Sequence, residues 1–130
     1  MVVLLVEDEE ALRDILRSAL ELAGMQVIPC RGVSAAIEYL EQARAYPDRA
    51  SGGSPAVPDV VLCDMHLPDG TGFDLLRSVA ELSAAHVVTM TAYGDPELHR
   101  LARRMGARRS LDKPFTLDQL MGAIAGARDL

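Results

Sequence analysis

Short apolar runs alternate with segments of helical periodicity five times along the chain. Residues Val2–Val6 are all apolar, which is typical of a strand covered on both faces of a parallel sheet. Apolar residues then recur at helical spacing from Leu12 to Leu20, and Gly24 ends that helix. The same alternation predicts further strands over 26–29, 60–63, 87–90 and 109–111, with helices starting near residues 34, 72, 96 and 117.

Two of the predicted helices carry clear start signals. Asp95 is placed as an N-cap, and Pro96 follows at the first helical position. Thr116 and Gln119 have the spacing of a capping box, while Phe115 and Leu120 are spaced as a hydrophobic staple around it. These signals support the positions of the fourth and fifth helices.

Five strand–helix units of this length predict an α/β fold with a parallel sheet and helices on both faces. Right-handed crossovers favour a flavodoxin-like, doubly wound (βα)5 sheet with strand order 2-1-3-4-5. We interpret residues 1–130 as one domain. Residues 46–58 hold three prolines and two glycines, which predicts a long flexible loop before the third strand, on the sheet edge opposite any active site.

Composition excludes several classes of protein. A hydrophobic content of 49% with 25% charged residues is typical of a soluble globular domain, and no apolar run approaches the length of a membrane span. The net charge of −6 argues against direct nucleic-acid binding by this domain. Cys30 and Cys63 lie in apolar strand-like runs, which favours reduced core cysteines and a cytoplasmic location.

Acidic residues stand where strands of the predicted sheet end. Glu7 and Asp8 follow the first strand and Asp64 the third, while Thr91 follows the fourth and Lys113 the fifth. Sites in such sheets form beyond the carboxyl ends of the strands, near the point where strand order reverses. We therefore expect three carboxylates, a hydroxyl and an ammonium group to converge there.

The convergence has chemical consequences. Two carboxylates ~4 Å apart repel by about 4 kcal/mol at an effective dielectric constant near 20, so a proton or a cation must enter. Carboxylate oxygens with room for water suit Mg²⁺. A carboxylate can also attack phosphorus to give an aspartyl phosphate, in which case Thr91 and Lys113 are placed to bind phosphoryl oxygens.

Lys113 is the only lysine among thirteen basic residues. Arginine presents a wide planar fork, whereas lysine presents a compact charge on a flexible stem. A small tetrahedral oxyanion favours the lysine. We therefore predict that Lys113→Arg impairs function although the charge is kept.

Four motifs in the expected order and strand context give the chain a resemblance to the receiver domains of two-component response regulators, from Val2 to about Ala125. The motifs are Leu-Leu-Val-Glu-Asp-Glu (4–9), Asp-Val-Val-Leu-Cys-Asp-Met-His-Leu-Pro-Asp-Gly (59–70), Met-Thr-Ala-Tyr-Gly-Asp (90–95) and Asp-Lys-Pro-Phe (112–115). The resemblance implies that Asp64 is the phosphoacceptor. It also implies a Mg²⁺ site formed by Asp8, Glu7 through water, Asp64, and the backbone carbonyl of His66.

The same resemblance implies a switch and partners. Thr91 would be the switch hydroxyl, and Lys113 would bind phosphate and precede Pro114 through a cis peptide. A sensor histidine kinase or phosphotransfer protein would supply the phosphoryl group. A homodimer or an output partner would use the face formed by the fourth helix, fifth strand and fifth helix, where Arg100, Arg103 and Arg104 form either a solvated or a docking surface.

Several positions depart from the family pattern. Ser110 stands where the family often has an aromatic whose rotamer reports phosphorylation, which argues against a swinging ring as the switch. Arg108 and Arg109 stand where many transcription factors of this family have acids for dimer salt bridges. His66 and Tyr93 are bulky at positions that tune hydrolysis of the acyl phosphate, which favours slow hydrolysis.

Three other functions remain as alternatives. An aspartate-nucleophile phosphatase would place a second acid two residues past the nucleophile, where this chain has His66. A flavodoxin-like nucleotide site needs a Gly- or Ser/Thr-rich loop after the first strand, where this chain has Glu7–Glu10. A receiver-shaped interaction domain without phosphorylation would not need the acids, Thr91 and Lys113.

Overall fold

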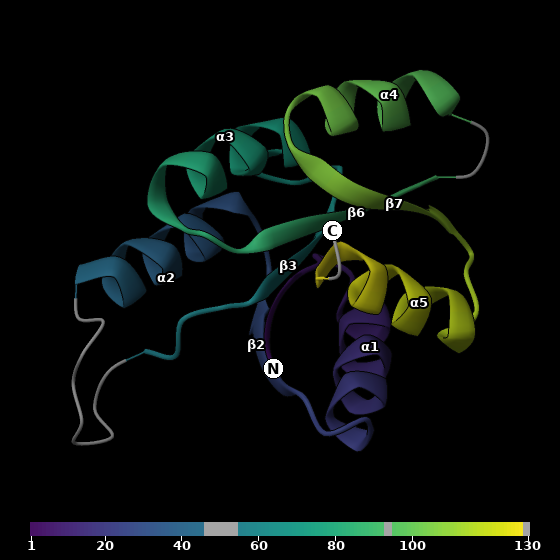
Figure 1. Ribbon diagram of the computed structural model, residues 1–130, viewed down its shortest axis with the longest axis horizontal. Coiled ribbons are helices and arrows are strands. Elements are labelled where there is room, and N and C mark those ends of the chain that lie inside the picture. Colours follow the sequence, from purple (N-terminus) through teal and green to yellow (C-terminus); the bar gives the residue numbers. More distant parts are fainter. Residues whose placement is uncertain (46–54, 93–94, 129–130) are drawn as a thin grey trace.

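The main sheet has five parallel strands in the order β2-β1-β3-β6-β7, which confirms the predicted order 2-1-3-4-5. A computed structural model describes residues 1–45, 55–92 and 95–128, and Figure 1 shows how their elements are arranged. In chain order the strands are β1 Val2–Val6, β2 Gln26–Cys30, β3 Val60–Asp64, β6 His86–Ala92 and β7 Ala107–Lys113.

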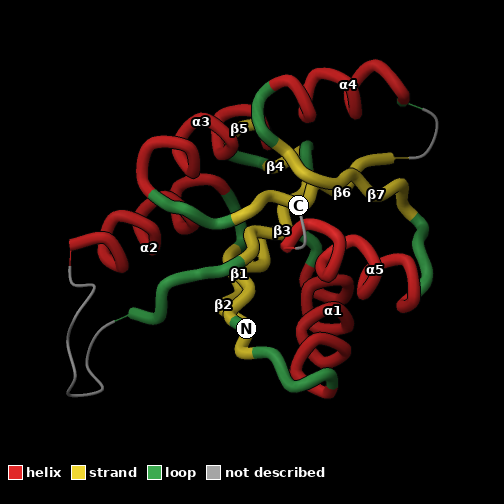
Figure 2. Tube along the Cα trace, in the orientation of Figure 1, coloured by secondary structure: helices red, strands yellow, loops and turns green. Residues whose placement is uncertain are grey.

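Five helices cover both faces of this sheet, as the doubly wound prediction requires. They are α1 Glu10–Leu22, α2 Val33–Ala45, α3 Gly72–Leu82, α4 Pro96–Arg104 and α5 Leu117–Arg128. Helices α1 and α5 lie on one face, and α2, α3 and α4 lie on the other (Figures 1 and 2). Strand residues alternate between two apolar clusters, so that Leu4 packs toward α2 and α3 while Leu5 packs toward α1 and α5.

The predicted helix starts are confirmed by their hydrogen bonds. The side chain of Asp95 accepts from the backbone N–H of Leu98 at 3.1 Å, and Pro96 occupies the first turn of α4. Thr116 and Gln119 form the reciprocal capping box at 2.8 and 3.1 Å. These caps fix where the loops from β6 and β7 enter their helices, directly beside the strand ends.

The structure differs from the prediction in the length of one strand and in two added strands. Strand β7 is longer than the expected 109–111, because as an edge strand it carries polar side chains that weaken its apolar pattern. A short antiparallel pair, β4 His66–Leu67 and β5 Gly70–Thr71, follows β3. Of the expected loop at 46–58, residues 46–54 lie outside the described residues. Ala56 in the described remainder accepts a hydrogen bond from the Tyr39 hydroxyl at 2.6 Å.

Helix α2 is capped by a residue that is distant in sequence. The carboxylate of Asp69 accepts from the backbone N–H groups of Val33 at 2.8 Å and Ser34 at 3.0 Å. A Cβ on Gly32 would collide with that carboxylate, so the close approach needs glycine there. The hydrogen bonds from Ser34 and Val33 hold the pKa of Asp69 below its usual value of 3.8.

We expect Asp69→Ala to lower the free energy of unfolding by about 1 kcal/mol at neutral pH, as for other lost helix caps. Because the folded-state pKa of Asp69 is lowered, its contribution is present above pH 3.8 and is lost as the pH falls further. Urea denaturation at neutral and acidic pH measures this. Asp14→Ala, an exposed change on α1, is the control, and equal losses in both variants would contradict the capping role.

Candidate functional site

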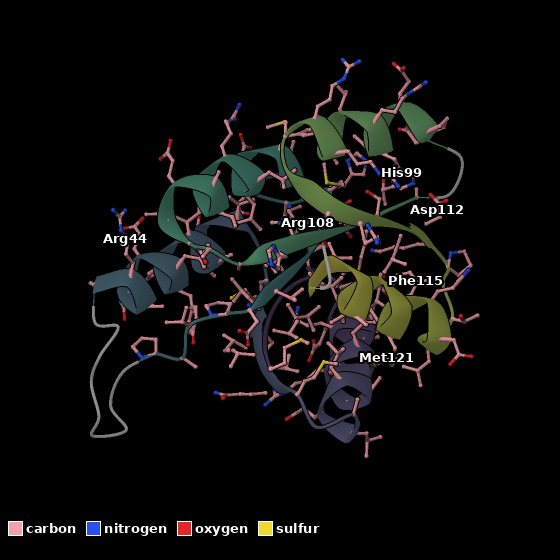
Figure 3. The ribbon with its side chains drawn as sticks, in the orientation of Figure 1. Arg44, His99, Arg108, Asp112, Phe115 and Met121 are labelled. Carbon is pink, nitrogen blue, oxygen red and sulfur yellow. The ribbon has the colours of Figure 1, made fainter. Side chains whose placement is uncertain are left out.

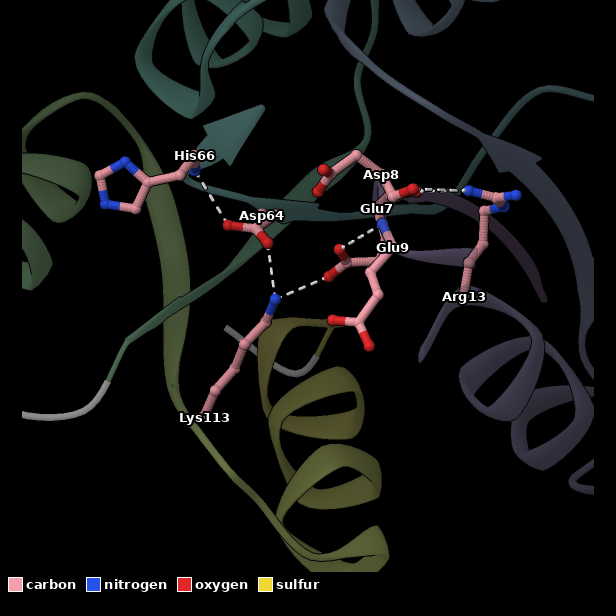
Figure 4. Close-up of polar contacts among 7 residues, drawn as sticks. All are labelled: Glu7, Asp8, Glu9, Arg13, Asp64, His66 and Lys113. Carbon is pink, nitrogen blue, oxygen red and sulfur yellow. Dashed lines mark hydrogen bonds and ion pairs between the residues drawn. The ribbon is translucent and has the colours of Figure 1, made fainter. Parts of the chain in front are cut away.

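The strand register brings the predicted site residues to one edge of the sheet. Val6 pairs with Cys63, so the next residues along the two strands, Glu7 and Asp64, lie side by side. Asp64 in turn pairs with Met90 on β6, directly before Thr91. Lys113 is the last residue of β7, paired with Ala92. Figure 4 shows the resulting cluster of acids around the lysine.

Lys113 bridges two buried carboxylates. Its Nζ donates to Glu7 Oε1 at 2.7 Å and to Asp64 Oδ2 at 2.6 Å (Figure 4). The side chain of Glu7 is 1% exposed and that of Asp64 is 9% exposed, while Lys113 is 25% exposed. The ammonium group of Lys113 therefore pairs with two carboxylates that are almost fully shielded from solvent, at the position that the sequence predicted for it.

The charges of this site are not fully balanced. Burial raises the pKa of Glu7 above its ordinary value, and the nearby charge of Asp64 adds to the rise, although the hydrogen bonds from Lys113 and Glu9 oppose it. Burial alone would lower the pKa of Lys113, but hydrogen bonds to Asp64 and Glu7 raise it. One lysine therefore does not offset the burial of Glu7, and a further cation would be favoured here.

Three carboxylates of the site are close enough to share one metal ion. Single oxygens of Glu7, Asp8 and Asp64 lie within 4.8 Å of one another, and Asp8 is the exposed member. An all-oxygen set with one side open to water fits Mg²⁺ or another hard divalent cation. The backbone N–H of His66 donates to Asp64 Oδ1 at 2.9 Å, and its ring is exposed. The metal role of the His66 carbonyl stays a prediction.

Thr91 holds a hydroxyl that is buried without a hydrogen bond. The residue is 1% exposed, and its Oγ1 has no partner among the described residues. A buried hydroxyl in this condition is costly unless a ligand completes it. By contrast, Thr89 on the same strand shares a 2.8 Å hydrogen bond with Ser110. Ser110, which stands where the family often has an aromatic residue, is thus a small side chain whose hydroxyl is hydrogen-bonded. Tyr93 lies outside the described residues.

Sequence reasoning missed two contacts beside the site. Arg13 of α1 donates to the backbone carbonyls of Glu7 and Asp8, and only its position near the start of α1, shortly after these acids, signals this. His99 of α4 contacts Asp112 of β7, with 2.5 Å between Nε2 and Oδ1 (Figure 3). That second contact ties α4 to the strand that ends in Lys113.

The arginines of α4 lie on the solvent side of the helix, as predicted. Arg100, Arg103 and Arg104 are exposed, and Arg100 pairs with Glu97 at 2.9 Å. Arg109 on β7 is partly buried, and a Cβ on Gly126 would come within 3.0 Å of its Nε. Arg109 thus packs across α5 and leaves the exposed positive charge of this side mainly on α4.

An apolar groove of about 700 Å³ opens beside the acids. One wall comes from α1, including Leu12 and Ile15, and the other from Phe115, which precedes α5, and from Leu117, the first residue of α5. The groove extends to Asp64 and Lys113. Ile15 and Leu117 are 64% and 54% exposed. Large apolar side chains this exposed beside a polar site are typical of a surface that contacts another molecule.

Comparison with known proteins places these features in a family context. Residues 3–125 match the model of the response regulator receiver domain. The chain is 30% identical over 131 residues to the chemotaxis protein CheY of Halobacterium salinarum, which covers 95% of this chain and 92% of that protein. It is similar, with a TM-score of 0.78 and 26% identity, to a crystal structure of a response regulator receiver domain protein from Clostridium thermocellum, covering 98% and 94% of the two chains.

A longer relative matches through only part of its length. The chain is 33% identical over 122 residues to the KDP operon transcriptional regulatory protein KdpE of Escherichia coli. That alignment covers 94% of this chain and 48% of KdpE, so the chain spans about half the length of that relative. Among the described residues, no helix is long and apolar enough to cross a membrane.

Proposed function

This chain belongs to the response regulator receiver domains of two-component signalling, and on that premise we propose that Asp64 is its phosphoacceptor. The observation that carries the proposal is the bridge from Lys113 to Asp64 and Glu7, beside an acidic cluster that fits a divalent cation. We further propose that Mg²⁺ is that cation, held by Glu7, Asp8, Asp64 and the carbonyl of His66. When bound, it would neutralise the acids and the incoming phosphoryl group.

The carboxylate of Asp64 acts as the nucleophile in this proposal. One of its oxygens forms a bond to phosphorus, while the bond from phosphorus to the donor nitrogen or oxygen breaks and the donor keeps the electron pair. The His66 N–H holds Oδ1 and Lys113 holds Oδ2, so the carboxylate is fixed before attack. Apart from its own phosphorylation and dephosphorylation, we propose no catalytic activity.

Thr91 and Lys113 then bind the transferred group. The ammonium of Lys113 pairs with a phosphoryl oxygen in place of a carboxylate oxygen, and the unpartnered hydroxyl of Thr91 donates to another. The contact of Thr91 supplies a partner that its hydroxyl lacks among the described residues before transfer. The geometry around Asp64 therefore changes with phosphorylation, and that change is the signal.

We propose that the phosphodonor, a sensor histidine kinase or a phosphotransfer protein, docks in the apolar groove between α1 and α5. The groove opens at Asp64 and presents Ile15 and Leu117, so a helix of the donor would bring its phosphohistidine to the carboxylate. The face of α4, β7 and α5 is left for a homodimer or another output partner, and we propose no nucleic-acid contact by this domain.

Residues 1–130 form a single receiver domain in this proposal. A cytoplasmic location agrees with Cys30 and Cys63, which are both buried and unpaired. Burial raises the pKa of the Cys63 thiol to about 12, so it stays an unreactive core residue beside Asp64.

The test is phosphorylation by a small donor. We expect incubation with acetyl phosphate and Mg²⁺ to shift nearly all of the protein on a phosphate-affinity gel, and expect no shift in EDTA. Asp64→Asn should abolish the shift, whereas Asp118→Asn, an exposed change on α5, should leave it intact. A shift that survives Asp64→Asn would refute the assignment of the phosphoacceptor. Repeated release of phosphate from unrelated esters would favour a phosphatase instead.

A further inference from the structure

Arg13 reaches back from α1 to the loop that carries the acidic pair. Its Nη1 donates to the carbonyl oxygen of Glu7 at 3.0 Å and to that of Asp8 at 3.3 Å (Figure 4). The loop is held at two more points, because the N–H of Glu7 donates to the Cys30 carbonyl and the N–H of Glu9 donates to Glu7 Oε2. Arg13 is therefore the side chain of α1 that restrains the backbone carbonyls of both acids.

The charge of Arg13 and its hydrogen bonds act in opposite directions on a cation at the site. A guanidinium beside the acids repels Mg²⁺, so its charge alone weakens binding of the metal. Its hydrogen bonds fix the two carbonyls, and so the direction in which the side chains of Glu7 and Asp8 leave the loop. A small cation with strict octahedral geometry binds more tightly to ligands that are already in place.

We propose that Arg13 is a positioning residue for the divalent cation, and that its hydrogen bonds outweigh its repulsion. The restraint matters most for Asp8, because this residue is the exposed member of the acidic cluster and lies between β1 and α1. Among the described residues, Arg13 is the side chain that donates a hydrogen bond to the Asp8 backbone. This inference rests on the proposed function, since it assumes that the acids bind Mg²⁺.

Arg17, one turn further along α1, offers a matched comparison. Its Nε pairs with Glu21 at 3.0 Å, both side chains are 48% exposed, and the pair lies on the helix surface. Arg17→Ala removes the same charge from the same helix without touching the loop. Any difference between the two variants therefore reports the contacts of Arg13 and not the net charge of the protein.

The experiment is a titration of the full ¹⁵N-labelled chain with MgCl₂, followed through backbone amide shifts near Glu7 and Asp64. We expect Arg13→Ala to raise the Kd for Mg²⁺ at least fivefold, and Arg17→Ala to change it less than twofold. Arg13→Lys keeps the charge but loses the planar fork, and we expect a rise of at least threefold. Thermal denaturation in EDTA establishes that each variant is folded.

The sign of the change decides between the two effects. A lower Kd in Arg13→Ala would overturn the inference, because charge repulsion would then dominate. An unchanged Kd would overturn it too, because the hydrogen bonds would then not outweigh the repulsion. A lower Tm with an unchanged Kd would assign Arg13 a purely structural role and would also overturn it. If Arg13→Ala does not fold, Arg13→Lys decides alone by the same criterion. A wild-type chain whose spectrum does not respond to Mg²⁺ would refute the metal site of the proposed function, and the inference with it.

Discussion

Lys113→Met is expected to lower the free energy of unfolding by about 3 kcal/mol at pH 7.5 without divalent cations, the lower end of the range for breaking a buried ion pair. Methionine has nearly the length of lysine, so packing is largely kept while the charge is lost. The carboxylates of Glu7 and Asp64 then remain side by side, 1% and 9% exposed, without their shared cation. Urea denaturation in EDTA measures the loss.

The loss should depend on pH in a defined direction. Burial raises the pKa of Glu7 in the folded protein, so the stability linked to this group is present below its ordinary value of 4.5 and is lost as the pH rises through the folded-state pKa. Removing Lys113 removes a hydrogen bond that opposes this rise. The pKa of Lys113 is raised from 10.5, so its own contribution is complete at pH 7.5. The variant should therefore approach wild type near pH 4.5.

Divalent cations supply the control for this prediction. In the wild type Lys113 competes with a metal for oxygens of Glu7 and Asp64, so Lys113→Met should bind Mg²⁺ more tightly and regain much of its stability at saturating Mg²⁺. Lys113→Arg keeps the charge and should lose much less stability, even though we expect it to impair signalling. A loss in Lys113→Met that is the same at both pH values and with Mg²⁺ would show that lost packing, and not lost charge, is responsible.

The position of the site follows from the sequence to an unusual degree. Continuous apolar strands and capped helices define the order of a doubly wound sheet, and the carboxyl ends of such strands meet at one edge. Glu7, Asp64 and Lys113 could therefore be placed together although they are up to 106 residues apart. The cis peptide before Pro114 was also expected, and it is present. It followed from the family resemblance and not from physical reasoning.

The contacts of individual side chains could not be predicted from the sequence. No periodicity shows that Arg13 turns back toward the Glu7 and Asp8 carbonyls, because a long flexible side chain has many rotamers and tertiary packing selects one. The contact between His99 and Asp112 depends on the lateral position of α4 over β7, which spacing along the chain does not define. The β4–β5 pair has two residues per strand, too few for an alternating pattern to be detected.

Thr91→Val is expected to change stability and function in opposite directions. The Thr91 hydroxyl is buried without a partner among the described residues, so replacing it with a methyl group should raise the free energy of unfolding by about 1–2 kcal/mol. The same replacement removes the hydroxyl proposed to bind a phosphoryl oxygen. Affinity for beryllofluoride, a phosphoryl analogue, should fall at least tenfold, as measured by ¹⁹F NMR in Mg²⁺.

Thr89→Val is the matched control for the gain in stability and the loss of beryllofluoride affinity expected for Thr91→Val. Both threonines are buried on β6, two residues apart, but the Thr89 hydroxyl shares a hydrogen bond with Ser110. Its removal leaves the Ser110 hydroxyl without that partner, so Thr89→Val should destabilise the protein by about 1 kcal/mol and leave beryllofluoride binding within twofold. If both variants lose stability equally, the Thr91 hydroxyl has a partner in the folded protein. In that case it is not held free for the phosphoryl group.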